Sequence, residues 1–532
     1  MTDEINRIVV VGGGSAGWLS AANFISVFPD KEIILVESDN IPTIGVGEST
    51  TAMFKYFING HLGISDDDFM PGCDAVYKMS VKFKNFSKEN DKGFHYPFGL
   101  PLLDNLDPFY IESWNLVKHF YPEYRDKDFA EYFFPGYHLF SNNKFDNNIN
   151  GDFDNYDPKS FLGYHLDANK LGPFLRDFYC LPRGVKHIIG DVGDIGLNNG
   201  CVKFVRVDDR IVHGDLFVDC TGYKSLLLKQ VYAPQFTDLS DNLINNRAWA
   251  TPIQYKNVYK ELQPYTTSTA LKNGWAWYTP ISSRVGNGYA YSDKYITSNQ
   301  ALVEFKDYLL SDNFPISLSK TELENLPFFE LKINAGYYDT PFVKNVVGIG
   351  LSSGFLEPLE GTGLFFITEP LLILNKLISR NCINQFMRDS FNNHVAELYE
   401  SWSDVLSSFY CTSARNDSLY WNEIQNKNTT QQKDSLYQKN YHGLREFQKR
   451  YISDHISNTT DFDAFTAMSI GNGLSSIDET SIRNWTYNEQ VNFSQIASNY
   501  KKILEDRKNK WIESSKNSIH IVDYLRKLGS KL

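Results

Sequence analysis

Two glycine-rich segments hold the residues whose types and spacing are best suited to chemistry, and the first lies near the amino end of the chain. Gly12, Gly14 and Gly17 have the G-x-G-x-x-G spacing between the apolar run 7–11 and the helical pattern of 18–25. A strand, a glycine turn and a helix amino end in this order bind the pyrophosphate of a dinucleotide. The candidate residues for this contact are Gly12, Gly14, Ser15, Ala16 and Gly17.

An acidic residue follows this turn at the distance that ribose binding requires. The second apolar run, 32–37, ends in Glu37, which stands 20 positions after Gly17. A carboxylate at this place accepts hydrogen bonds from ribose hydroxyls. The pattern does not distinguish NAD from FAD, and a structural glycine turn in another α/β unit is the alternative.

The second segment, 346–364, combines glycines and hydroxyls with the carboxylates of Glu357 and Glu360, just before a predicted helix. The backbone amides of 361–363 would then form an anion-binding nest at the helix amino end. The alternative is an ordinary helix-entry loop whose acidic residues favour the helix dipole.

Lysines alternate with apolar residues along 76–86, which predicts a strand. Lys78, Lys82 and Lys84 fall on one face, and a solvated lysine face is the simplest interpretation. Lys78 would instead be available for catalysis if its surroundings were partly buried.

Three further groups of residues are candidates for lining a site. The loop 41–50 carries a carboxylate and hydroxyls that would either face a cofactor or lie on an ordinary surface loop. An apolar run ends in Asp219 and Gly222, at the sheet edge where α/β proteins bind ligands. Trp275 and Trp277 share one strand face, either as an aromatic wall or as packed core.

Composition limits the partners of the chain. Its 532 residues, 42% of them hydrophobic, suffice for one large core or several. A formal net charge of -12 argues against nucleic acid or an anionic membrane, because either needs a basic surface. The six cysteines show no C-x-x-C spacing and the histidines no H-x-x-x-H pair, so no protein-bound metal is expected. The acidic start and the absence of an apolar run of roughly 18 residues predict a soluble, cytoplasmic protein.

Taken in order, the motifs resemble those of the flavin-dependent halogenases of the tryptophan-halogenase type, from Arg7 to about Tyr420. The motifs are 12–17, Gly45-Val-Gly-Glu-Ser-Thr50, Tyr77-Lys78, 217–222, Trp275-Ala-Trp277 and Phe355-Leu-Glu-Pro-Leu-Glu-Gly-Thr-Gly363. The high Asn, Lys and Tyr content suggests an AT-rich genome, such as that of a marine phage or bacterium.

The resemblance implies an α/β, FAD-binding, Rossmann-like flavin-monooxygenase fold with inserted substrate-side β elements and a helical C-terminal unit. We expect residues 1–374 to form the FAD-binding module, with insertions over about 55–160 and 245–335. Residues 375–532 would form the helical unit that completes the substrate site. The implied FAD-binding residues are Gly12, Gly14, Ser15, Ala16, Gly17, Glu37, Gly47, Glu48, Ser49, Asp219, Gly222 and Gly350.

In this family, a separate NAD(P)H flavin reductase supplies FADH2, and oxygen and halide are then converted to hypohalous acid. A stable complex with the reductase is not expected. The resemblance implies that Lys78 holds or carries the electrophilic halogen beside a small aromatic substrate such as an indole or phenol. It implies that Glu360 polarises the halogen or takes up the ring proton. No nucleic acid, membrane or metal is implied, and the oligomeric state is left open.

The halide would lie against the amides of Thr362 and Gly363, and the tunnel or substrate barrier would include Trp275, Trp277 and Pro280. Two departures from the family pattern are present, since Thr279 replaces the usual isoleucine of W-x-W-x-I-P and Gly361 replaces a serine after the glutamate. The second removes a side chain beside the halide site and favours a larger, more easily oxidised halide, bromide or iodide, over chloride.

Two alternatives stand beside the halogenase. A flavin-dependent aromatic hydroxylase shares the flavin motifs but does not need Lys78 together with the tryptophan pair and Glu360. It would also reduce its own flavin with NAD(P)H. A non-catalytic flavin-binding protein is the alternative from another class.

Overall fold

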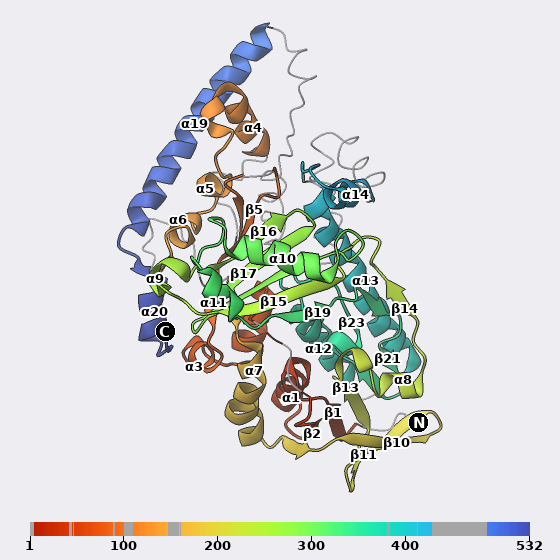
Figure 1. Ribbon diagram of the computed structural model, residues 1–532. Helices are drawn as coiled ribbons and strands as arrows, with labels where there is room; N and C mark the ends of the chain where they lie inside the picture. Colours follow the sequence, from red (N-terminus) through yellow and green to blue (C-terminus); the bar gives the residue numbers. More distant parts are fainter. Residues whose placement is uncertain are drawn as a thin grey trace.

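The computed structural model describes residues 5–41, 45, 47–88, 91–99, 110–146, 159, 161–379, 383–411, 413–427 and 487–532. Within this part the chain is a mixed α/β structure, with a largely parallel sheet at one end and a larger, mostly antiparallel sheet in the middle (Figure 1).

The parallel sheet has six described strands in the order β21-β22-β13-β1-β2-β9. Their bounds are Phe342–Val343, Val346–Gly348, Leu216–Asp219, Arg7–Val11, Glu32–Glu37 and Lys186–Ile189. β1 is central and pairs in parallel with both β13 and β2. Residues 8–11 are buried on both faces, which explains the unbroken apolar run. Helix α1 (Ser15–Val27) follows the glycine turn, and Asn23 on it exchanges hydrogen bonds of 2.8 Å with Asn375 of helix α12 (Phe365–Ile378).

The larger sheet has seven described strands in the order β19-β15-β18-β17-β16-β5-β6. Their bounds are Phe329–Lys332, Arg247–Ile253, Val285–Tyr291, Gly274–Pro280, Tyr265–Leu271, Ser80–Lys84 and Phe94–Pro97. Helix α10 (Ser298–Leu309), which begins with a capping box at Thr297, supplies part of the apolar cluster of this sheet. Both segments expected to be insertions therefore contribute strands to one sheet.

A third, small sheet, β3-β8-β4, contains Glu48–Ser49, Gly163–Leu166 and Val76–Lys78. The single strand predicted over 76–86 is broken at Met79 because the chain changes sheets there. The Met79 amide donates to the Pro264 carbonyl at 2.8 Å, and its carbonyl accepts from Phe98 at 2.9 Å. This corner places Lys78 between the two sheets.

Helices dominate the later part of the described chain and cover two sides of the molecule (Figure 1). Their bounds are α13 (Gln385–Cys411), α14 (Leu419–Lys427), α19 (Tyr487–Ser515) and α20 (Ile521–Lys527). α19 packs on α4 (Tyr110–Phe120) and α5 (Ala130–Phe133) around Trp114. The expected division after residue 374 falls within α12, and residues 428–486 of the expected helical unit lie outside the described part.

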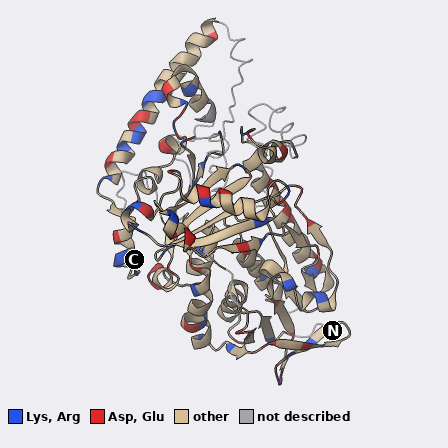
Figure 2. Ribbon diagram, viewed as in Figure 1, with Lys and Arg blue, Asp and Glu red and all other residues tan. Residues whose placement is uncertain are grey.

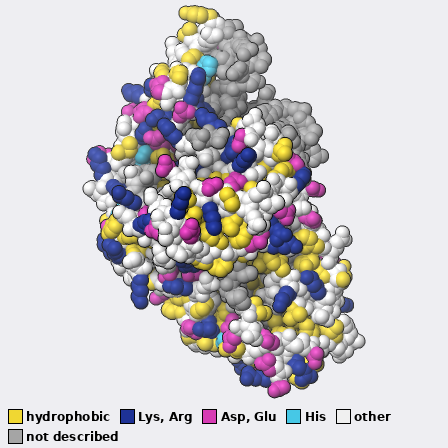
Figure 3. All heavy atoms as spheres, viewed as in Figure 1, with side chains coloured by type: hydrophobic (Ala, Val, Ile, Leu, Met, Phe, Trp, Pro, Cys, Tyr) yellow, Lys and Arg dark blue, Asp and Glu magenta, His cyan; other side chains and the backbone are white. Residues whose placement is uncertain are grey.

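Acidic and basic side chains are intermixed on the surface that Figure 3 presents and along α19 in Figure 2. Among the described residues, no helix is long and apolar enough to cross a membrane. A search of the same residues finds no cluster of His, Cys, Asp and Glu suited to a metal ion.

Candidate active site

The glycine turn after β1 is built for close approach of backbone and ligand. A side chain at Gly12, whose φ is +116°, would place its Cβ 2.3 Å from the Cys220 carbonyl oxygen, and one at Gly17 would lie 1.7 Å from the Gly12 oxygen. Gly14 faces open space and caps α1 without a side chain. The first amides of α1 are thus presented to an anion such as a pyrophosphate. The glycine spacing therefore fits a bound dinucleotide.

Glu37 ends β2 directly over this turn. Its carboxylate lies 2.6 Å from His187 Nε2 and accepts a 3.4 Å hydrogen bond from Trp18 Nε1. A Cβ at Gly13 would collide with Glu37, so only glycine fits beneath the carboxylate. Residues Ser15 and Ala16 open α1 beside it. His187 was missed by sequence reasoning because no motif singles it out.

Asp219 lies at the expected edge of the sheet, but its carboxylate is hydrogen-bonded to backbone amides of the protein itself. Its buried carboxylate accepts from the amides of Leu227 at 2.7 Å, Leu228 at 2.9 Å and Thr221 at 3.0 Å. This holds the loop after β13, which includes Gly222 with a φ of +70°. Gly350, with a φ of +67°, lies against Ala16, where a Cβ would be 3.0 Å from the Ala16 Cβ.

The loop that carries Gly47, Glu48 and Ser49 enters the small sheet as β3. Glu48 and Ser49 pair with Leu166 and His165 of β8. Removal from water, with a smaller contribution from Asp167, raises the pKa of Glu48 to about 7.

Lys78 is fully buried, so the interpretation as a solvated lysine face is wrong for this residue. Its Nζ lies 4.8 Å from the centre of the Phe98 ring and has no hydrogen-bond partner among the described residues. Burial lowers the pKa of Lys78 to about 8, and the charge of Glu360 opposes that shift. The ammonium and the Glu360 carboxylate thus interact within one buried region.

Glu360 is 4% exposed and lies in the turn before α12. The Gly361 amide donates to the Pro358 carbonyl at 3.1 Å, so of the three amides expected in the nest only those of Thr362 and Gly363 remain for an anion. Gly361 has a φ of +65°, and a Cβ there would be 2.4 Å from the Ser49 carbonyl oxygen. The turn with Glu360 therefore packs tightly on the Ser49 loop.

The tryptophan pair lies on β17, with ring centroids 5.8 Å apart. Trp275 is opposite Ala290 and Trp277 opposite Gly288, so small residues of β18 leave space for both indoles. A Cβ at Gly288 would lie 2.0 Å from the Trp277 ring. Both indoles are buried in an apolar cluster that also contains Tyr77 and Phe83, and β17 ends at Pro280.

A buried histidine connects these segments. His165 Nδ1 lies 3.0 Å from the Pro280 carbonyl oxygen, and Nε2 lies 2.7 Å from Thr266 Oγ1, which is 3.2 Å from Ser49 Oγ. Burial and the nearby Lys78 hold the pKa of His165 well below its usual value. A carbonyl only accepts, so Nδ1 carries the hydrogen of the neutral ring and Nε2 accepts from Thr266, which accepts from Ser49. An isolated histidine gave no sequence signal for this role.

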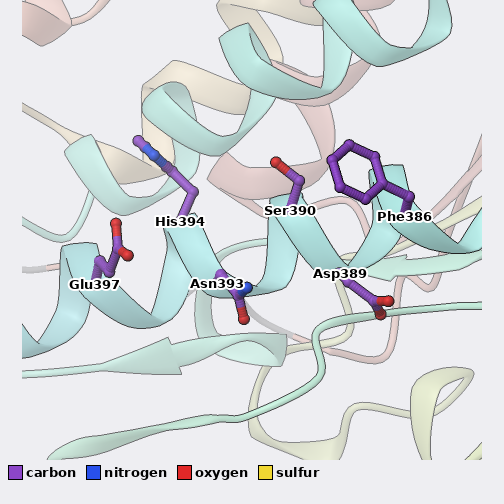
Figure 4. A pocket seen from close by; sticks show the side chains of 6 residues that line it. All are labelled: Phe386, Asp389, Ser390, Asn393, His394 and Glu397. Atoms are coloured by element: carbon purple, nitrogen blue, oxygen red, sulfur yellow. The ribbon is translucent and has the colours of Figure 1, made fainter.

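A hollow on α13 has a volume of about 550 Å³. Figure 4 shows its lining residues along this one helix, from Phe386 to Glu397. None of the residues selected from the sequence motifs lines it.

Known proteins resemble this chain in both sequence and fold. The family model described as Tryptophan halogenase matches residues 7–463. Tryptophan 6-halogenase ThaL of Streptomyces albogriseolus is 31% identical over 437 residues, 79% of each chain, and tryptophan 7-halogenase RebH of Lentzea aerocolonigenes is 30% identical over 82% of each. The apo structure of VirX1 is 31% identical with a TM-score of 0.84, covering 99% of this chain and 100% of its own. BrvH, a flavin-dependent halogenase from Brevundimonas sp. BAL3, is 26% identical with a TM-score of 0.79, covering 98% of this chain and 99% of its own.

Proposed function

The chain belongs to the tryptophan halogenase family, and we propose that it uses Lys78 and Glu360 to halogenate an electron-rich aromatic compound with hypohalous acid made at a bound flavin. The enzyme class, flavin-dependent halogenase, and the α/β fold follow from the family match and from the solved structures. The residue roles, the halide and the substrate class are the proposal.

The proposal rests on the burial of both Lys78 and Glu360, with the glutamate charge acting to raise the pKa of the lysine. Burying charged groups is costly, so such groups are retained where they do chemistry more often than elsewhere. An ammonium donates hydrogen bonds to the oxygen of a neutral hypohalous acid and polarises its bond to the halogen. A carboxylate beside it accepts the proton that the aromatic ring loses.

The glycine turn, Glu37 and the Ser49 loop would hold FAD, with Asp219 acting through the loop that it fixes. When bound as FADH2, this group supplies two electrons to oxygen, so that halide is oxidised to hypohalous acid and water is formed. Thr362 and Gly363 would present their amides to the halide beforehand. No oxidant beyond oxygen is required.

The halogenation step balances with the residues present. The ring forms a carbon–halogen bond and the halogen–oxygen bond breaks, while the ring proton passes to Glu360. Lys78 gives a proton to the departing hydroxide, which leaves as water, and the proton taken up by Glu360 then restores the Lys78 ammonium. The net change converts an aromatic C–H and hypohalous acid to an aryl halide and water.

The Gly361 backbone supports a preference for bromide or iodide over chloride. No side chain extends from this position toward the halide amides, and the contact with Ser49 leaves no room for one. The serine hydroxyl that is usual in the family is therefore missing, and the loss of this hydrogen-bond donor weakens binding of a small, strongly hydrated chloride more than binding of a larger, more easily oxidised halide. A separate NAD(P)H flavin reductase is the proposed source of FADH2, and a small indole or phenol is the proposed substrate class.

The test is mass spectrometry of indole and phenol after incubation with the protein, FAD, a flavin reductase, NADH and oxygen in chloride, bromide or iodide. Catalase in every tube removes free peroxide. Aryl halide that increases with the concentration of the protein supports the proposal. Ring hydroxylation in place of halogenation, or NADPH oxidation without the reductase, would identify an aromatic hydroxylase instead.

A further inference from the structure

A second buried acid lies three residues before Glu360 and has no part in the chemistry described above. Glu357 is 1% exposed. Burial raises its pKa to about 7, and the hydrogen bonds from Tyr410 and Asn245 oppose that shift.

The partners of Glu357 form a closed ring of hydrogen bonds. Tyr410 donates its hydroxyl to Oε1, and Asn245 Nδ2 donates to Oε2 at 3.1 Å and to the Tyr410 oxygen at 3.0 Å. Tyr420 donates to Asn245 Oδ1 at 3.1 Å. Every polar atom of the Asn245 amide is therefore used, and all four side chains are buried.

The ring joins parts of the chain that are far apart in sequence. Tyr410 lies on α13, Tyr420 on α14, and Asn245 just before β15, whereas Glu357 begins the turn that leads through Glu360 into α12. That turn is short, because the Gly361 amide already bonds to the Pro358 carbonyl. A shift of the Glu357 carboxylate is thus passed to Glu360 and to the amides behind it.

We propose that Glu357 is a positioning residue for halogenation, which, through Tyr410 and Asn245, lets helices α13 and α14 fix the turn that carries Glu360 and the halide-binding amides. This inference rests on the proposed function of Glu360. Its consequence is that the ring of hydrogen bonds controls the yield of aryl halide for each oxidant formed, more than it controls substrate binding.

The experiment uses the full-length protein with FAD, a flavin reductase, NADH and bromide, with indole as the probe. The variants are Glu357→Leu, Tyr410→Phe and Glu357→Gln, and the control is Tyr399→Phe. Tyr399 is also a buried tyrosine of α13, but its ring stacks on Phe366, and the described hydrogen bonds of Glu357 go to Tyr410 and Asn245. Measured quantities are kcat and KM for indole, bromoindole formed per oxygen consumed, and the melting temperature.

We expect Glu357→Leu and Tyr410→Phe to lower kcat and the bromoindole yield about 10-fold or more, with the KM for indole changed less than about threefold. Glu357→Gln should keep at least about a third of the activity, because its amide still accepts from Asn245 and pairs with Tyr410. Tyr399→Phe should resemble the wild type. Because reduced flavin also reacts with oxygen off the enzyme, the yield is normalised to the amount of folded protein, which separates positioning from folding.

Equal yields from Tyr410→Phe and Tyr399→Phe would overturn the inference, as would losses that only follow the amount of folded protein. If the wild type forms bromoindole and the variants have the same kcat and yield, the positioning role of Glu357 is wrong, but the proposed function stands. An absence of product from the wild type would overturn the proposed function, and this inference with it.

Discussion

Ser49 and His165 are direct register partners in the antiparallel pair β3–β8, and the Thr266 hydroxyl joins their side chains. The opposite edge of β8 pairs with β4, where Lys78 lies across from Gly163. The loop proposed to hold the flavin and the strand proposed to deliver the halogen are therefore two edges of one small sheet, with His165 on its central strand.

This position makes His165 a sensitive test of the site's architecture. We expect His165→Leu to leave the Thr266 hydroxyl and the Pro280 carbonyl without their partner, at a cost of about 1–3 kcal/mol in the free energy of unfolding. Halogenation should fall with it. Denaturant unfolding and product yield measure both effects, and the control is His213→Leu at an exposed position of strand β12 (Arg210–His213). If His165→Leu leaves the free energy of unfolding unchanged, the hydrogen bonds from His165 to Thr266 and Pro280 do not stabilise the site.

The pH dependence of halogenation follows from the buried lysine. Burial lowers the pKa of Lys78 to about 8, so its ammonium form is lost as the pH rises through that value. We expect kcat/KM for the aromatic substrate to fall on the alkaline side near pH 8, well below the value for an exposed lysine. The measurement is product formation from pH 6 to 10 with reductase in excess. Activity that stays level up to pH 10 would contradict an ammonium donor.

Gly361 should resist replacement by the serine that is usual in the family. With a φ of +65° and a Cβ only 2.4 Å from the Ser49 oxygen, Gly361→Ser should cost about 1–3 kcal/mol and lower product formation with all three halides. Gly200→Ser has a φ of +73°, and its Cβ would meet only the Lys344 side chain at an ordinary 3.7 Å, so this variant separates backbone strain from the collision. Competition between halides measures preference, and a variant that becomes an efficient chlorinating enzyme would contradict this packing argument.

If Trp275 and Trp277 form a barrier, disturbing Trp277 should let hypohalous acid escape from the protein. A Cβ at Gly288 would lie 2.0 Å from the Trp277 ring, whereas one at Gly193 meets no atom within 4 Å. Gly288→Ala should therefore displace the indole, reduce product per oxygen consumed several-fold and raise the hypohalous acid captured by an added scavenger, and Gly193→Ala should change neither. If both alanine variants release the same amount of oxidant, Trp277 is not part of the barrier.

Local pattern was enough to predict the first strand, its glycine turn and α1, because apolar runs and glycine spacing are set by nearby residues. The helix after β8 begins at a cap of the same local kind, since the Asp167 carboxylate accepts from the Asn169 amide at 3.1 Å. The break at Met79 was not predictable, since strand periodicity continues through it and only long-range pairing decides the change of sheet. His165, His187 and the ring around Glu357 depend on contacts between distant segments, which no local spacing reports.

The proposed role of the Lys78 ammonium in polarising hypohalous acid is tested most directly by the amount of product formed per oxygen consumed. Wild type, Lys78→Ala and Lys82→Ala would be compared with indole, bromide, FAD, reductase and catalase. Lys82 lies on the neighbouring strand β5 and is only partly buried. We expect Lys78→Ala to consume oxygen at the wild-type rate but to lose at least about 99% of the bromoindole, while Lys82→Ala keeps most of it. Bromoindole from Lys78→Ala at a level close to that of the wild type would contradict the account.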